Sequence, residues 1–441
     1  MLQGLVRALG EALVRLYYPV RIVDDGQRIP TDKPVIFVLN HPNGLMDPLV
    51  LRVATGRRSR FLAKSSLFGN PLGRLAMNAF GSIPIHRPAE SSPAAVAGNE
   101  ESFARCRAEL AAGGVLALFP EGTSHSDPQL RPLKTGAARI ALSAEAKADG
   151  RLGVTIVPVG LAYERKTQFR SSVLLVVGEP LVVAPLLPDY RRDERGTVAA
   201  LTAEIAARLD AIVLQAESRD LLAGIARVAR WTSAAPDDVA ARHRAAREMA
   251  AAYERLRARD PARVDAIVAE VRTYGQTLRR LGVRDPWALE MGAPRAGAIL
   301  GAVGILALAA PLALLGALMG WVPYRLSGVV ARRVTRDEDL LSTVKLLAGA
   351  LFLVVGWSAE AAVAGWWRGA AWAAPVFGLG VASGYVALRF EELLRDGRAA
   401  WRALSMRAFH FQTARRLADR RRALADAVTR ALRDEASGSA E

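Results

Sequence analysis

The sequence contains a single cysteine, Cys106, and only six lysines among its 441 residues. One cysteine excludes a disulfide framework and any cysteine-rich zinc site, so we expect Cys106 to be a small core residue. With 51% hydrophobic and 23% charged residues, the chain is neither disordered nor built of membrane spans throughout. These proportions predict a globular part joined to a few membrane spans.

Acidic charge is also scarce relative to basic charge. Lys and Arg number 59 and Asp and Glu 43, a net charge of +16 that is carried almost entirely by arginine. Such a balance favours anionic partners. No recognition motif or basic platform interleaved with aromatic residues accompanies the charge, and the arginines gather largely near long apolar segments. We therefore expect an anionic phospholipid membrane as a partner and no nucleic acid.

A secretory signal peptide is not expected at the N-terminus. Arg7, Glu11 and Arg15 interrupt the apolar residues, and no small-residue cleavage site follows. The apolar side chains of residues 1–18 share one helical stripe. This pattern predicts an amphipathic helix that either lies on a membrane surface or packs against the globular part.

Residues 19–188 alternate short apolar runs with helical stretches, which predicts an α/β domain with a largely parallel sheet flanked by helices. The expected strands are Val35–Leu39, Arg60–Ala63, Ser82–Ile85, Val115–Phe119, Val154–Gly160 and Val173–Val177. The expected helices are Pro48–Ala54, Leu67–Ala79, Ala94–Ala111 and Thr135–Ala146.

The rest of the chain is expected to be helical. Residues 189–290 have helical spacing and few strand signals, which predicts a helical connector. Residues 291–390 contain three apolar stretches, each long enough to cross a bilayer, at about 296–322, 346–367 and 369–388. Residues 391–441 predict a basic helical tail that rests on anionic lipid or stays solvated.

The arginine-rich flanks of these stretches complicate the membrane topology. The positive-inside rule places the segment before residue 296, the loop 325–345 and the tail after Arg389 on the cytoplasmic side, but three full crossings would separate them. We therefore expect Pro311 to break the first stretch into a re-entrant or interfacial hairpin. The second and third stretches would then form a two-span hairpin.

A histidine and an aspartate follow the first strong strand. The strand 35–39 leads into Asn40-His41-Pro42-Asn43-Gly44, and Asp47 lies six residues after His41. A neutral imidazole can take a proton from an alcohol while a carboxylate holds its tautomer. Six residues is poor spacing along a regular helix, but Asn43-Gly44 supplies a turn able to bring the two side chains together.

Three further blocks carry polar residues at strand ends. Arg87 follows the strand 82–85, where a guanidinium is able to grip a phosphate. A second turn runs Phe119-Pro120-Glu121-Gly122-Thr123-Ser124-His125, and Lys134 precedes the helix after it. Exposed N–H groups, hydroxyls and a helix N-terminus suit an anionic oxygen. The fourth block, Ile156-Val157-Pro158-Val159-Gly160, is a buried strand.

Together and in this order, these blocks resemble the glycerol-phosphate acyltransferase family, over about residues 20–185. The resemblance implies that His41 is the general base and Asp47 its orienting acid. It also implies an acceptor-binding set comprising Lys64, Arg87, Glu121, Gly122, Thr123, Ser124 and Lys134. No cofactor and no metal are implied, and acyl-CoA or acyl carrier protein is the co-substrate.

Two departures from the common family pattern point to one branch. Five residues separate His41 from Asp47 where four are usual, and Ser124 replaces the usual arginine. Both are similar to the fungal-type branch acting on glycerol 3-phosphate and dihydroxyacetone phosphate, which also carries membrane segments after the catalytic domain. Acylation of one of these acceptors in phospholipid biosynthesis is therefore expected. The alternatives are lysophosphatidate acylation and a non-catalytic lipid-binding protein.

The resemblance and the arginine distribution also imply a location. We expect the protein in the cell (inner) membrane, with the catalytic domain on the cytoplasmic face.

Overall fold

The computed structural model describes residues 2–23, 29–86, 93–233, 235, 238–282, 296–335 and 338–438. The chain forms two compact units. The first comprises Met1–Arg219 together with Thr335–Leu346, and the second comprises Asp220–Val334 together with Leu347–Glu441.

The first unit is built on a sheet of eight strands within the described residues, and seven of them follow the order β1-β7-β6-β2-β5-β3-β4, with β8 beside β6. The strands are β1 (Val20–Val23), β2 (Val35–Leu39), β3 (Ser59–Lys64), β4 (Ile83–Ile85), β5 (Val115–Leu118), β6 (Thr155–Tyr163), β7 (Val173–Val177) and β8 (Leu181–Val182). Adjacent strands are parallel except where β6 meets β7 and β8. The predicted largely parallel sheet is therefore confirmed.

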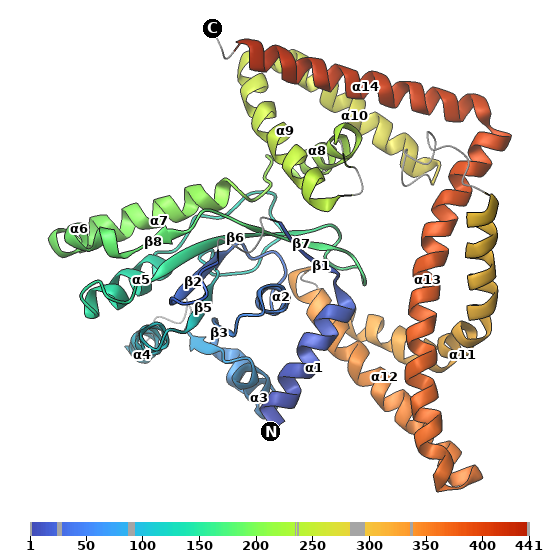
Figure 1. Cartoon of the computed structure of the whole chain (residues 1–441), viewed down its shortest axis with the longest axis horizontal. Coiled ribbons are helices and arrows are strands. Elements are labelled where there is room, and N and C mark those ends of the chain that lie inside the picture. The colour runs from blue at the N-terminus through green and yellow to red at the C-terminus, as the bar shows by residue number, and fades with distance from the viewer. Residues whose placement is uncertain are drawn as a thin grey trace. The chain divides into compact units, whose positions relative to one another are not determined.

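Helices cover both faces of this sheet (Figure 1). One face carries α1 (Leu2–Tyr17), α2 (Met46–Thr55) and α3 (Pro71–Ala79), and α1 packs on both α2 and α3. On the other face lie α4 (Pro93–Ala111), α5 (Gly136–Lys147), α6 (Leu187–Arg192) and α7 (Glu194–Asp210). Short 3-10 turns occupy Ser65–Phe68 and Ala184–Leu186.

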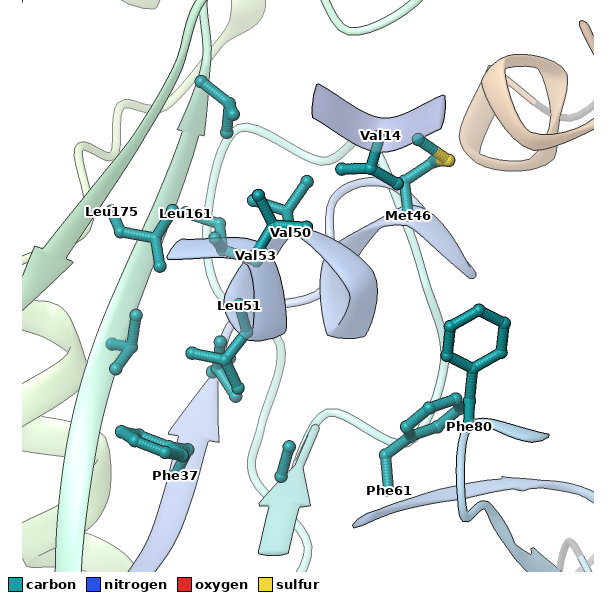
Figure 2. Packing of buried hydrophobic residues seen from close by; sticks show 14 of the residues in the cluster. Val14, Phe37, Met46, Val50, Leu51, Val53, Phe61, Phe80, Leu161 and Leu175 are labelled. Atoms are coloured by element: carbon teal, nitrogen blue, oxygen red, sulfur yellow. The ribbon is translucent and has the colours of Figure 1, made fainter. Parts of the chain in front are cut away.

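The main hydrophobic core lies between the sheet and the first of these helix layers. Figure 2 shows Val50 and Leu51 of α2 among side chains from the strands and from α1. Alternate residues of β2, such as Phe37, face this core, and all five residues of β2 are buried because the sheet is covered on both sides. Close packing around β2 fixes the position of its last residue, from which the following loop begins.

The sequence pattern located most of these elements. β2 and β7 have the predicted bounds, and the other predicted strands and helices differ from the structure mainly at their ends. The strands β1 and β8 were missed, because β1 has only four residues, including Arg21, and β8 only two. The predicted N-terminal helix is α1, with Leu2, Leu5 and Leu9 exposed.

The second unit is helical. Its helices are α8 (Arg219–Thr232), α9 (Val239–Arg259), α10 (Pro261–Arg280), α11 (Ala296–Val334), α12 (Glu338–Arg368), α13 (Ala373–Phe409) and α14 (Phe411–Gly438), with a 3-10 turn at Ala370–Trp372. The first residues of α12 belong to the first unit. Three segments, Val303–Val334, Leu340–Arg368 and Ala370–Leu394, are long and apolar enough to cross a membrane.

The prediction that Pro311 breaks the first apolar stretch is wrong. α11 is one helix that contains both Pro311 and Pro323. A proline removes one intrahelical hydrogen bond, at a cost of about 3 kcal/mol, and in a helix of 39 residues the remaining bonds keep the helix continuous. α11 bends along its length in Figure 1, as helices with internal prolines do.

Candidate active site

The candidate site lies where four neighbouring strands end. β6, β2, β5 and β3 are parallel to one another in this order, so their carboxyl ends meet at one edge of the sheet. His41 follows β2 and Glu121 follows β5, while Tyr163 and Lys64 are the last residues of β6 and β3. Ligands of open α/β sheets bind at this edge.

His41 and Asp47 form a hydrogen-bonded pair at this edge. His41 Nδ1 lies 2.8 Å from Asp47 Oδ2. The pair forms because the chain turns sharply between them: Gly44 has a φ of +47°, a conformation that favours glycine, and α2 begins two residues later. The turn places Asp47 in the first turn of α2, where a carboxylate is favoured by the helix dipole.

Asp47 is completely buried and its two oxygens accept three hydrogen bonds. Besides His41, the Asn43 N–H donates to Oδ2 at 2.8 Å and the Tyr163 hydroxyl donates to Oδ1 at 2.7 Å. Burial, followed by the charge of Asp47, raises the pKa of Tyr163 well above its usual value, so the phenol stays a donor. These bonds compensate the burial of a charge and fix the carboxylate toward the imidazole.

The other ring nitrogen of His41, Nε2, makes no hydrogen bond within the described part of the chain. The His41 side chain is 17% exposed, and its ring stacks on Phe119 with centroids 4.0 Å apart and planes 21° apart. When Nδ1 donates to Asp47, Nε2 carries the free lone pair. The geometry therefore presents an oriented base at the surface of the site.

Glu121 connects the loop after β5 to the loop after β2. Its Oε1 accepts the His41 N–H at 2.9 Å, and its Oε2 accepts the Arg131 N–H at 2.9 Å and bonds His125 Nε2. The His125 N–H also donates to the His41 carbonyl at 3.1 Å. The Glu121 side chain is fully buried, so this carboxylate has a positioning role, and its contact with the acceptor stays a prediction.

Gly122 and Lys134 lie together on the same loop. Gly122 has a φ of +75°, and a Cβ there would come within 2.5 Å of Lys134 Nζ. The turn is closed by two backbone bonds, Gly122 N–H to Phe119 O at 2.9 Å and Lys134 N–H to Pro120 O at 2.7 Å. Glycine is thus required both by its conformation and by the ammonium that lies against it.

Most of the predicted site residues are therefore at one edge of the sheet. Thr123 and Ser124 are half-buried in the loop with Gly122, and Lys64 is half-buried at the end of β3. Arg87 lies outside the described residues. Within the described ranges, no group of three or more His, Cys, Asp or Glu is placed to hold a metal ion.

Several supporting residues were not predicted. Tyr18 accepts a bond from Asn43 Nδ2 at 2.9 Å and donates to the Lys166 carbonyl, which also accepts the Ser342 hydroxyl at 2.6 Å. Burial raises the pKa of Tyr18 to about 12. These residues are far from one another in sequence, and no local pattern in the sequence pointed to them.

Comparison with known proteins finds a family match over the part of the chain that carries this site. The sequence model of the Acyltransferase family matches residues 21–162, which include the His41–Asp47 pair and the Glu121 loop. Residues 21–162 are therefore similar to the Acyltransferase family.

Among curated relatives, glycerol-3-phosphate O-acyltransferase 2 of Saccharomyces cerevisiae is 38% identical over 125 residues, covering 28% of this chain and 17% of that protein. A chloroplastic 1-acyl-sn-glycerol-3-phosphate acyltransferase of Brassica napus is 29% identical over 131 residues, covering 30% and 33%. The match thus spans at most about a third of these relatives. The 1-acyl-sn-glycerophosphate acyltransferase PlsC of Thermotoga maritima aligns over 47% of this chain and 80% of that structure, with 20% identity and a TM-score of 0.32.

Proposed function

We propose that the protein transfers a fatty acyl group from a thioester to a hydroxyl of glycerol 3-phosphate or dihydroxyacetone phosphate. The observation that carries the proposal is the His41–Asp47 bond of 2.8 Å with Nε2 left free. The similarity to a glycerol-3-phosphate O-acyltransferase of Saccharomyces cerevisiae supports these acceptors. The plant relatives that act on 1-acyl-sn-glycerol 3-phosphate keep lysophosphatidate as the second candidate.

The proposed reaction needs no covalent enzyme intermediate. His41 Nε2 takes the hydroxyl proton as the oxygen attacks the thioester carbonyl, and Asp47 stabilises the imidazolium that forms. The tetrahedral intermediate collapses with loss of the thiolate, which receives the proton from His41. The products are the acyl ester and free CoA or acyl carrier protein, with no cofactor consumed.

The loop after β5 is suited to hold the negative charges of the reactants. The Gly122 N–H is already bonded to Phe119 O at 2.9 Å, so we assign the oxyanion to the following N–H groups, those of Thr123 and Ser124. Lys134, beside Gly122, and Lys64 are proposed to bind the acceptor phosphate. Arg87 is kept as a third phosphate ligand on the sequence pattern.

The proposal is tested by giving the purified, detergent-solubilised protein three acceptors with labelled palmitoyl-CoA or palmitoyl-acyl carrier protein and identifying the products. The acceptors are glycerol 3-phosphate, dihydroxyacetone phosphate and 1-acylglycerol 3-phosphate. We expect labelled monoacyl product from one of the first two. Product from 1-acylglycerol 3-phosphate alone would move the assignment to the second candidate, and no labelled ester from any acceptor would contradict an acyltransferase.

We also propose that α12 and α13 form a two-span hairpin and that α11 makes no net crossing. The first unit, which contains the candidate active site, is called the catalytic unit below. The first residues of α12 belong to it, and the Ser342 hydroxyl bonds the Lys166 carbonyl. Among the described residues, no membrane-capable segment lies between residue 219 and the end of α10. We therefore propose that both ends of α11 lie on the same side of the membrane as the catalytic unit.

The far end of the chain fits the same topology. α14 packs on α9 and α10, with Arg263 Nη2 2.8 Å from Asp434 Oδ2 and the Tyr274 hydroxyl 3.3 Å from the Leu417 carbonyl. The chain thus returns through α13 to the side it left through α12. The arginines that follow Leu388 favour the cytoplasm for this side, and we propose on this ground that the catalytic domain lies at the cytoplasmic face of the cell membrane.

Cysteine labelling tests this topology without replacement of the native thiol. Cys106 is fully buried, and burial raises the pKa of its thiol to about 12, so it stays unreactive in the folded protein. Single variants Ala266→Cys, Thr335→Cys and Ala370→Cys are treated with an impermeant maleimide in oriented vesicles. We expect the first two to react from the cytoplasmic side and the third from the opposite side. Reaction of Ala266→Cys and Thr335→Cys from opposite sides would show that α11 crosses.

A further inference from the structure

A cavity outside the catalytic unit lies within the helical second unit. Its volume is about 150 Å³, and its walls come from α8, α9, α10 and α14. The lining is mainly aliphatic, with Val228, Met249, Val271 and Val428 among its members. An aliphatic cavity of this size does not hold ordered water well and is a natural site for an apolar guest.

Arginines border this apolar cavity. Arg227 of α8 lines it together with Arg272 and Arg279 of α10. The Arg227 guanidinium lies against the backbone of α10, because a Cβ on Gly275 would come within 2.3 Å of its Nη1. Positions 272 and 279 are three residues before and four residues after Gly275, so they share its face of α10 and flank the guanidinium.

Arg227 is a half-buried cation without a compensating acid. It makes no ion pair or hydrogen bond within the described ranges, although Asp220 also lines the cavity. Burial and the neighbouring charge of Arg279 lower the pKa of Arg227 below its usual value. An anion held among these arginines would relieve both the desolvation and the repulsion between like charges.

We propose that this cavity binds a single-chain amphiphile with an anionic head group, whose hydrocarbon enters the aliphatic cavity and whose head contacts Arg227 and Arg279. A fatty carboxylate and a lysophospholipid phosphate share this chemistry. The site is separate from the candidate active site, and the proposal holds whichever acceptor the enzyme uses.

Photocrosslinking of the full-length protein in neutral phosphatidylcholine nanodiscs tests the proposal. The probe is a palmitate analogue carrying a diazirine in its chain, and the labelled peptides are mapped by mass spectrometry. Competition is measured with oleate, with 1-oleoyl lysophosphatidate and with uncharged methyl oleate. We expect saturable labelling of α8 and α10 that one or both anionic competitors displace and methyl oleate displaces poorly. Displacement by only one of them identifies the head group as carboxylate or phosphate.

Three variants make the test specific. Arg227→Met keeps the length of the side chain but removes its charge, and should weaken labelling about tenfold or more. Arg280→Met is the matched control, because Arg280 is exposed and next to Arg279 but does not line the cavity. Gly224→Leu fills the cavity from a position where only Val271 lies within 4 Å, and should also block labelling.

Circular dichroism and thermal shift check the folding of these variants, and basal acyl transfer should be unchanged, since none of the three positions belongs to the candidate active site. Equal labelling in Arg227→Met and Arg280→Met, or equal displacement by methyl oleate and oleate, would overturn the anionic site. Labelling that persists unchanged in an active Gly224→Leu protein would overturn the cavity as its location.

Discussion

Two histidine–carboxylate pairs lie at the same edge of the sheet and differ in what their second ring nitrogen does. His41 bonds Asp47 through Nδ1, keeps Nε2 free and has a side chain 17% exposed. His125 bonds Glu121 through Nε2, and its Nδ1 accepts the Asp127 N–H at 3.2 Å in a side chain 8% exposed. An imidazole bonded to a carboxylate thus keeps a free ring nitrogen in one case and has both ring nitrogens bonded in the other.

The hydrogen bonds of the two ring nitrogens, and not the presence of a His–carboxylate pair, decide which histidine is able to take a proton. A general base needs a lone pair that points to the reacting hydroxyl. His125 has both nitrogens committed to holding the loop after β5, so we expect its loss to change stability more than chemistry. The predictions below separate the two pairs.

The largest expected effect is that of His41→Gln. Glutamine keeps a polar side chain of similar length but has no imidazole to accept the proton, so turnover should fall by about 10²–10⁴-fold. The measurement is transfer of labelled palmitate from palmitoyl-CoA to glycerol 3-phosphate. His125→Gln is the matched control and should retain turnover in its folded fraction. Wild-type turnover in a folded His41→Gln protein would contradict the assignment.

Asp47→Asn should be nearly as severe. The amide no longer favours the tautomer with the proton on Nδ1, so Nε2 becomes protonated and cannot accept the proton of the hydroxyl. We expect kcat to fall by up to about 10⁴-fold, as in hydrolase triads. KM should change little, because no substrate contact is removed. Steady-state kinetics check this, and an unchanged kcat would show that Asp47 does not orient the base.

His125→Ala should act on stability. Its removal leaves the buried Glu121 Oε2 with the Arg131 N–H as its remaining donor, at a cost of about 1–3 kcal/mol. A thermal-shift measurement should therefore show a lower unfolding temperature, while kcat per folded molecule is largely retained. A loss of kcat equal to that of His41→Gln, with unchanged stability, would make His125 part of the chemistry.

Tyr163→Phe should have an intermediate effect on rate. It removes one of the donors to the buried Asp47, a bond to a charged group worth about 1.5–3 kcal/mol, and we expect kcat to fall by about tenfold. Burial raises the pKa of Tyr163 well above the usual value for a tyrosine, so the phenol is neutral at and near neutral pH. It loses its proton only when the pH rises above this raised pKa. The shape of the pH–rate profile near neutrality should therefore be the same in the variant. A changed shape would implicate the phenol in proton transfer.

The smallest effect is expected for Ser342→Ala at the start of α12. It removes one bond to the Lys166 carbonyl, which keeps its bond from Tyr18, so the cost should be about 0.5–1.5 kcal/mol. Thr343→Val is the matched control, since the Thr343 hydroxyl is buried without a partner and its removal should be neutral or stabilising. Thermal shifts of equal size in both variants would contradict a stabilising hydrogen bond between Ser342 of α12 and the Lys166 carbonyl.

The sequence predicted those features that depend on local patterns. The runs of apolar residues gave β2 and β7, and Asn43-Gly44 correctly indicated a turn that joins His41 to Asp47. Glycine at position 122 was predicted as part of the loop, but its contact with Lys134 required the folded turn. Local signals therefore located the loops that carry the predicted site residues.

The supporting contacts depend on the order of the strands, which no local pattern reveals. Tyr163 reaches Asp47 across 116 positions and Glu121 reaches His41 across 80, because β6 and β5 lie on either side of β2. Pro311 misled the prediction of a break in the first apolar stretch, since a proline costs a long helix one hydrogen bond without ending it. The role of Glu121 as a connection between loops likewise follows from its long-range contact with His41, and its contact with the acceptor stays a prediction.

The most direct test of the central claim is the tautomer of His41 in the resting protein. With ¹⁵N-labelled histidine, the imidazole signals of the five histidines are measured at mildly alkaline pH and that of His41 is assigned by its absence in His41→Gln. The hydrogen bond to Asp47 predicts a protonated Nδ1 and an unprotonated Nε2, and Asp47→Asn should remove this preference. A protonated Nε2 in the unmodified protein would contradict His41 as the base.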